Sequence, residues 1–256
     1  MKLRKTALAA LAAAAIAASA AASAEDRIVI CSNADEEAQE AMKHALDGNG
    51  FAGRYVLQAM GTSELGGKLM AEKRNIEADI ITLSTYYLDS AQARDHVFAD
   101  LSFDHKAADG SEVPFYAPIL GNTGALFVNT KVLKDSGPLK KIRAGEVAVG
   151  FGLRHQAVAD KKKGLPVDVI DPKEGNFTLT EAIAVVDKGE KTNPDAMKAA
   201  EVIVKKARPE LLKFYPFAIY QGETVDADLV PAYPRAFKEK LTVELLKKHQ
   251  EMVKDE

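Results

Sequence analysis

Short runs of apolar and β-branched residues alternate with helix-forming segments at the start of the chain. Residues 28–32 and 78–83 have the composition of buried strands, and residues 55–59 have the composition of a further strand. Residues 34–46 and 64–74, which lie between them, are typical of helices. Strands joined in this order require right-handed crossovers. The pattern predicts an α/β fold with mostly parallel central sheets and helices on both faces.

The rest of the chain continues this pattern less regularly. Strands are expected at residues 124–129, 146–151, 167–170 and 183–186. Helices are expected at residues 153–162, 194–206 and 234–254. The length suits one large domain or two smaller lobes.

The N-terminus has the three-part pattern of a secretory signal. Basic residues begin it, an Ala/Leu/Ile run fills residues 7–18, and Ala22-Ser23-Ala24 ends it. A membrane anchor is the alternative, but the run is short and Ala-rich for a span of about 20 apolar residues. We expect residues 1–24 to be a signal peptide that is cleaved after Ala24, which predicts a periplasmic protein.

Charge and cysteine content restrict the partners. The formal net charge is −3, and acidic and basic residues are scattered along the chain, so no basic surface for nucleic acid is expected. Cys31 is the only cysteine, which excludes an intrachain disulfide and favours a buried thiol. We expect a soluble monomer without a cofactor.

Polar residues follow the first three predicted strands. In an α/β sheet, ligands bind outside the carboxyl ends of the strands. The residues at these ends include Ser32, Asn33, Thr62, Ser63, Ser84 and Tyr86. Gly61-Thr62-Ser63 also opens a helix, whose backbone N–H groups suit an anion. Alternatively, Thr62 or Ser63 only caps that helix.

Three blocks of sequence resemble periplasmic substrate-binding proteins of ABC importers, in the branch that includes ferric-ion and 2-aminoethylphosphonate binders. They are YVLQAMGTSELGGKLMAEKRNIEADIITLSTYYLDSA, GNTGALFVNTKVLKD and RAGEVAVGFGLRHQAVADKKKGLPVDVIDPKEGNFTLTEAIAVVDKG. The resemblance implies a type II periplasmic-binding-protein fold, in which two α/β lobes joined by crossing strands close over a ligand.

The resemblance also implies a division of the chain. Residues 25–112 would form lobe 1, residues 113–180 lobe 2 with the crossing strands, and residues 181–256 the return to lobe 1 with C-terminal helices. Family members usually carry a longer segment between the second and third blocks. Here residues 138–141 pass almost directly into residues 142–146. We therefore expect a shortened second lobe.

Several further residues complete the predicted site. Asn122 and Thr123 add an amide and a hydroxyl from the second block. Arg154 suits a carboxylate, phosphate or phosphonate, and His155 adds another donor. A salt bridge within the lobe or at the surface is the alternative for Arg154. Glu174 would bind an ammonium group, or would only shape a turn.

These features predict the solute-binding component of an ABC importer, which captures a small anionic solute (a phosphonate, phosphate ester or carboxylate) and delivers it to a membrane permease. Ferric iron is an alternative ligand, although Tyr86-Tyr87 does not match the position of the family's metal tyrosines. An enzyme is a second alternative. GTSELGGK departs from the phosphate loop of nucleotide hydrolases, and the histidines lack a common ligand spacing. A third alternative is a shortened protein that binds no solute and only interacts with partner proteins.

Overall fold

The computed structural model describes residues 27–129, 148–215, 217–227 and 229–254. The predicted signal peptide and the junction at residues 138–146 lie outside these ranges. The chain begins with three parallel strands, of which β1 is the central one. They are β1 (Ile28–Ser32), β2 (Tyr55–Ala59) and β3 (Ile80–Ser84). The buried β-branched residues of β1 and β3 explain why the sequence alone located these two strands.

Two long strands cross the molecule and pair antiparallel with each other. They are β4 (Ala117–Asn129) and β7 (Asn176–Val185), and β7 also runs antiparallel to β3. The sheet order is β2-β1-β3-β7-β4-β5, with β6 paired to β4 and β8 to β7. Parallel pairing is therefore confined to β1–β3 and the short β7–β8 pair. The expectation of mostly parallel sheets fails beyond β3, because β4 and β7 enter the sheet as returning strands rather than through crossover helices.

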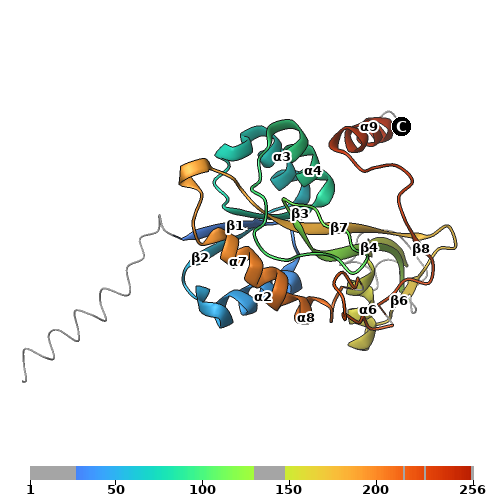
Figure 1. Cartoon of the computed structure of the whole chain (residues 1–256). Coiled ribbons are helices and arrows are strands. Elements are labelled where there is room, and N and C mark those ends of the chain that lie inside the picture. The colour runs from blue at the N-terminus through green and yellow to red at the C-terminus, as the bar shows by residue number, and fades with distance from the viewer. Residues whose placement is uncertain (1–26, 130–147, 216, 228, 255–256) are drawn as a thin grey trace, which may run out of the picture.

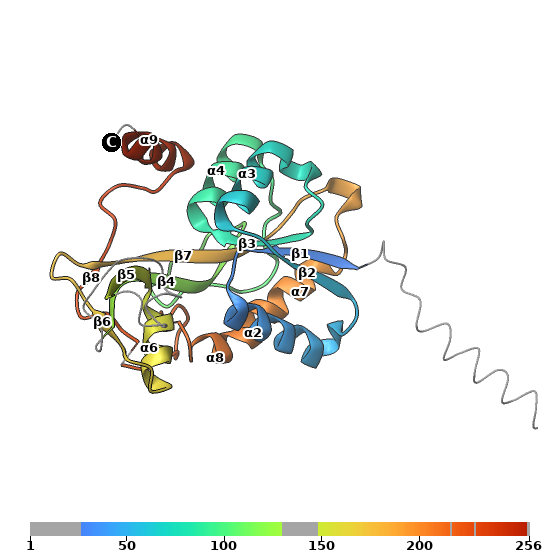
Figure 2. The ribbon, with the colours of Figure 1, turned by 180° about the vertical axis from the view of Figure 1, so that it is seen from behind.

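Helices cover both faces of the β1–β3 part of the sheet (Figures 1 and 2). One face carries α3 (Thr62–Glu72) and α4 (Thr85–Asp95), which pack on buried residues such as Leu83. The other face carries α2 (Glu36–Leu46), α7 (Ala196–Val202) and α8 (Arg208–Leu211). This is the expected layered α/β arrangement.

A smaller unit surrounds the far end of β4. It comprises β5 (Val149–Leu153), α6 (Arg154–Lys162) and β6 (Val167–Ile170). Its buried cluster is small and consists of Ala125, Phe127, Ala157 and Val167. The predicted helix at 153–162 and strand at 167–170 lie here with almost unchanged bounds, whereas the predicted strand at 146–151 is found at 149–153.

The C-terminal third differs most from expectation. The predicted helix at 194–206 is α7, which continues through a wider turn (Ile203–Ala207) into α8. The predicted helix at 234–254 is only its second half, α9 (Val243–Lys254). Its first half holds β8 (Pro234–Arg235), where the chain runs beside β7. The predicted strand at 183–186 is the end of the longer β7.

The remaining short helical segments are Asp47–Phe51, Lys73–Asn75 and Gly189–Lys191. Within the described ranges, no helix has the length and apolarity needed to cross a membrane.

The contact between α3 and α4 provides a test of the fold. A Cβ atom built at Gly66 would overlap the Tyr87 ring, whereas a Cβ atom at Gly67 would have open space. We expect Gly66→Ala to lower the free energy of unfolding by about 1–3 kcal/mol through overpacking. Gly67→Ala should raise it by up to about 1 kcal/mol, since alanine favours helix. Urea denaturation measures both, and equal effects would contradict this packing.

Candidate functional site

A buried carboxyl group joins three elements at the centre of the molecule. Glu181 lies on β7 with 5% of its surface exposed. Its Oε1 accepts hydrogen bonds from Asn33 Nδ2 at 2.9 Å and from Asn122 Nδ2 at 3.0 Å. Asn33 Nδ2 also donates to Thr62 Oγ1 at 3.0 Å. We call Asn33, Thr62, Asn122 and Glu181 the central polar cluster.

The central polar cluster retains hydrogen-bonding capacity that no protein group uses. Three of its buried oxygen atoms have no hydrogen-bond partner, namely Asn33 Oδ1, Asn122 Oδ1 and Glu181 Oε2. Burial raises the pKa of Glu181 to about 7, and the hydrogen bonds from the two asparagines oppose this rise. Unsatisfied buried polar atoms are costly, so a group of them indicates a place where another molecule binds.

The strand ends bring the central polar cluster together. Asn33 directly follows β1, and Thr62 is the first residue of α3, which follows β2. The buried hydroxyl of Ser32 accepts from Thr82 Oγ1 at 2.6 Å and from the Ala34 backbone N–H at 3.1 Å. These bonds fix the chain where β1 ends and so hold the Asn33 backbone in place.

A second set of contacts links α2 to the smaller unit. Asp35 is the N-cap of α2, and its Oδ2 lies 3.0 Å from His155 Nε2 on α6. The Tyr215 hydroxyl donates to Asp35 Oδ1. Burial alone would raise the pKa of Asp35, but the hydrogen bonds from His155 and Tyr215 outweigh it and keep this pKa below its ordinary value. His155 thus connects the two units of the protein.

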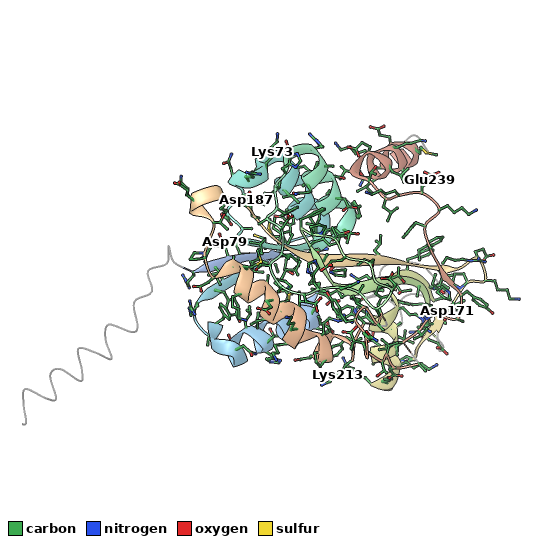
Figure 3. The ribbon with its side chains drawn as sticks, viewed as in Figure 1. Lys73, Asp79, Asp171, Asp187, Lys213 and Glu239 are labelled. Carbon is green, nitrogen blue, oxygen red and sulfur yellow. The ribbon has the colours of Figure 1, made fainter. Side chains whose placement is uncertain are left out.

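Arg154 makes an ion pair within the smaller unit. Its Nε and Nη2 donate to the two oxygens of Asp171 at 3.1 and 3.0 Å. Asp171 Oδ2 also accepts from the Ala232 backbone N–H. Figure 3 places Asp171 near β6 and β8, at the end of the molecule opposite β1 and β2. This arrangement is the alternative that the sequence left open for Arg154, a salt bridge within the lobe.

Tyr86 and Glu174 line a cavity of about 900 Å³ between β7 and the C-terminal segment. Phe177 and Leu179 of β7 also line it, and the Phe177 and Phe237 rings lie 4.8 Å apart. Burial is the main reason that the pKa of Tyr86 is raised to about 12. Most of the lining surface is apolar, and the charged residues Glu174, Arg235, Lys238 and Glu239 also line the cavity.

The structure brings some predicted site residues together and separates others. Asn33, Thr62 and Asn122 meet in the central polar cluster, while Tyr86 and Glu174 line the cavity. The Thr123 hydroxyl forms a hydrogen bond with the Thr178 hydroxyl, with 2.7 Å between the two oxygens. Ser84 is buried and is the register partner of Glu181 between β3 and β7, although its hydroxyl does not bond the cluster in the described contacts. Ser32 is buried, Ser63 is exposed, and Arg154 and His155 are held by aspartates.

Glu181, Asp35 and Tyr215 were not among the predicted site residues. Glu181 precedes a buried apolar run, Ala182–Val186, and a lone acid at the edge of such a run is a signal that the sequence offered. Asp35 lies at the start of the predicted helix at residues 34–46, where an acidic residue is expected for the helix alone. Nothing in the sequence around Tyr215 pointed to Asp35, which is distant along the chain.

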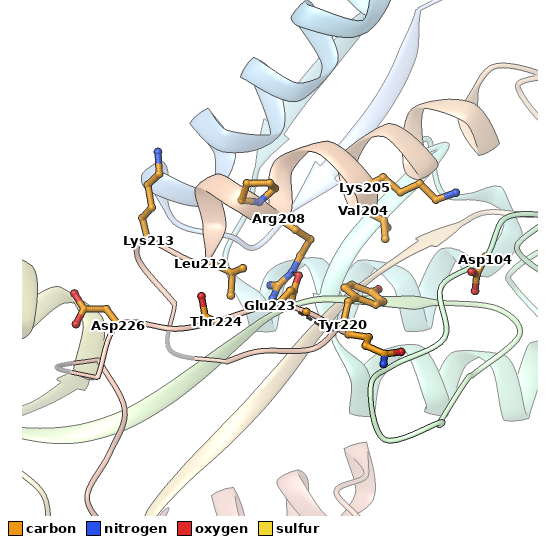
Figure 4. A pocket seen from close by; sticks show the side chains of 13 residues that line it. Asp104, Val204, Lys205, Arg208, Leu212, Lys213, Tyr220, Glu223, Thr224 and Asp226 are labelled. Carbon is orange, nitrogen blue, oxygen red and sulfur yellow. Dashed lines mark hydrogen bonds and ion pairs between the residues drawn. The ribbon is translucent and has the colours of Figure 1, made fainter.

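A second large cavity, of about 740 Å³, lies beside α8 (Figure 4). Arg208 at its wall donates to both oxygens of Glu223, to the Ile119 carbonyl and to the Phe217 carbonyl. Arg208 and Glu223 are thus used by the protein itself. Among the described residues, no group of three or more His, Cys, Asp and Glu side chains could hold a metal ion.

The raised pKa of Glu181 predicts a pH-dependent stability. The folded state keeps this proton up to pH about 7, whereas an ordinary glutamate loses it near pH 4.5. The free energy of unfolding should therefore fall between these pH values, by up to about 3 kcal/mol from this group. Glu181→Gln should lack this decrease in urea titrations at pH 4.5, 6 and 8.

Glu244→Gln, at an exposed position of α9, is the matched control. It should leave the pH profile of the wild type unchanged. Parallel profiles for the wild type and Glu181→Gln would show that the carboxyl group is not held in a desolvated site.

Neither a family model nor a curated protein sequence matches the chain. Several solved structures, however, are similar to this one. Iron-bound HitA from Pseudomonas aeruginosa is 15% identical with a TM-score of 0.64, covering 89% of this chain and 97% of its own. A periplasmic thiamin binding protein is also 15% identical with a TM-score of 0.66, covering 89% of this chain and 94% of its own.

The periplasmic binding protein AfuA from Actinobacillus pleuropneumoniae, with fructose-6-phosphate bound, is 13% identical with a TM-score of 0.62; the match covers 80% of this chain and 89% of AfuA. The ligands of these three proteins differ in charge and size, so the shared architecture does not identify a ligand. It does identify the fold: the chain has the fold of type II periplasmic binding proteins.

Proposed function

We propose that the protein binds a small polar solute and delivers it to the membrane permease of an ABC importer. The central polar cluster carries the proposal, because its buried amide and carboxyl oxygens have capacity that the protein leaves unused. The cluster lies where β1 and α3 meet the crossing strands β4 and β7. Crevices at the carboxyl ends of strands are the usual ligand sites of α/β sheets.

The site suits binding better than catalysis. Its members are amides, a hydroxyl and a carboxyl group, and they hydrogen-bond to one another rather than forming a pair of nucleophile and base. Export through the predicted signal at residues 1–24 would place the protein in the periplasm, where it could bind a solute before the solute reaches the permease. The structural neighbours described as periplasmic binding proteins support this location.

The sequence predicted an anionic solute, and one part of the structure supports this. The N-terminus of α3, at Thr62 and Ser63, borders the central polar cluster and offers the positive end of the helix dipole. Glu64 balances this end in part, since it accepts from the Gly61 backbone N–H at 3.3 Å. Arg154 supports an anion less, because Asp171 already occupies its guanidinium fork.

Thermal unfolding in the presence of solutes tests the proposal. A chain beginning at Glu25 would be screened against phosphonates, phosphate esters, carboxylates, amines and ferric citrate. A solute at 100 times its Kd should stabilise the fold by about 2.7 kcal/mol, since it binds only the folded state. Asn33→Ala should weaken binding at least tenfold, whereas Asn75→Ala, on the α3–β3 connection, should not. If no solute of a broad library stabilises the protein, the proposed function is wrong.

Arg154→Met separates the two roles of this arginine. Removing the partner of the mostly buried Asp171 should cost about 3 kcal/mol of stability. Lys161 lies on the same helix as Arg154, and Lys161→Met breaks its exposed pair with Asp168 of β6. This change should cost less than about 1 kcal/mol of stability. We expect affinity for the best solute to change less than threefold in both variants. A larger loss in Arg154→Met alone would assign Arg154 to the solute.

A further inference from the structure

One face of β7 extends from the 900 Å³ cavity toward the central polar cluster. Side chains alternate along a strand, so Phe177, Leu179 and Glu181 share a face. Asn122 belongs to the same face, because it is the register partner of Leu179 on the antiparallel strand β4. Phe177 and Leu179 line the 900 Å³ cavity. The cavity and the central polar cluster thus lie along one continuous surface of the sheet.

Tyr86 provides a second link between the cavity and the cluster. It lines the cavity, and the Glu181 carboxyl group contributes to the upward shift of its pKa, after the larger effects of burial and of Tyr87. α4 begins directly after Ser84, the last residue of β3, and Tyr86 is its second residue. Tyr86 therefore lies close to the end of the strand that pairs with β7. Glu181 is not among the residues that line the cavity, but it lies close enough to Tyr86, which does line it, to affect its pKa.

When Glu181 is ionised, the unused atoms of the central polar cluster are all acceptors. They are one oxygen each of Glu181, Asn33 and Asn122, and they surround a hydrogen-bonded core in which both amide N–H₂ groups already point at Glu181 Oε1. An acceptor needs a donor, and an alkylammonium group offers three N–H donors and a positive charge. A bare anion would meet three oxygen atoms here and would be repelled.

The charge around Glu181 agrees with this chemistry. Among the described residues, no lysine, arginine or histidine forms an ion pair with Glu181, and the only charged group that shifts its pKa is Asp35, which raises it. Asp35 is already paired with His155, whereas Glu181 has no neutralising cation among the described residues. A cation brought by the solute would stabilise the charged form of Glu181.

We propose that the solute carries a protonated amine, whose N–H groups bind Glu181 Oε2 and the free amide oxygens of Asn33 and Asn122. Its carbon skeleton lies against Leu179 and Phe177. This inference rests on the proposed solute-binding function and narrows it to amine-bearing solutes. A zwitterion would also satisfy the N-terminus of α3, because an acidic group at its other end could approach Thr62.

Pairs of solutes that differ only in the amine test this assignment. Suitable pairs are 2-aminoethylphosphonate with ethylphosphonate, 4-aminobutyrate with butyrate, and pentylamine with pentanol. Calorimetric titration at pH 7.5 should show the amine of at least one pair binding tenfold or more tightly than its partner. In Glu181→Gln, which keeps the shape and loses the charge, this preference should fall to less than threefold.

Glu64→Gln is the matched control, because it removes one negative charge from the edge of the same site without touching the three acceptors. It should keep the tenfold preference for the amine. Unfolding curves of both variants establish that they are folded at the titration temperature.

The outcomes separate the two proposals. If amine-free anions bind and their amine counterparts bind no better, the amine assignment is wrong while the solute-binding function stands. An amine preference that survives in Glu181→Gln would also overturn the assignment of this residue. If nothing in the panel or in a broad library binds, the function itself is wrong and the assignment falls with it.

Discussion

The antiparallel pairing of β4 with β7 is the constraint on which the rest of the structure depends. These two strands form the most extensive strand pair of the sheet, and they belong to both parts of the molecule. One end of β7 pairs with β3 beside the parallel strands, and β4 carries β5 and β6 at its other end. Because the polar residues Asn122 and Glu181 lie on this pair, the site is built where the two parts are joined.

The sequence predicted the elements whose own residues specify them. β1 and β3 are short buried runs, β2 is a short half-buried run, and α2 and α6 have clear starts and ends, so local composition was sufficient. It could not give the direction of β4 and β7, which depends on partners distant in the chain. Nor did it show that residues 234–242 would lie along β7 instead of forming a helix. Pairing between remote segments overrides local propensity there.

The candidate site shows the same division. The rule that ligands bind at strand ends identified Asn33 and Thr62, which the structure joins by a hydrogen bond. Arg154 was chosen for its chemistry alone, yet its guanidinium binds Asp171. Glu181 was missed, although it links two of the predicted residues. The role of a charged side chain depends on its neighbours, and residue type alone does not determine those neighbours.

The bond network at Asp35 has a mechanical consequence. Besides the sheet itself, the Asp35 carboxylate connects α2 to α6. One of its oxygens is hydrogen-bonded to His155 of α6, and the other accepts from the Tyr215 hydroxyl. Any hinge movement that draws α6 away from α2 must break the His155 bond, whereas the ladder between β4 and β7 can stay intact. Part of the work of separating the two halves is then spent at this contact, and another part at the ion pair between Lys162 of α6 and Asp226.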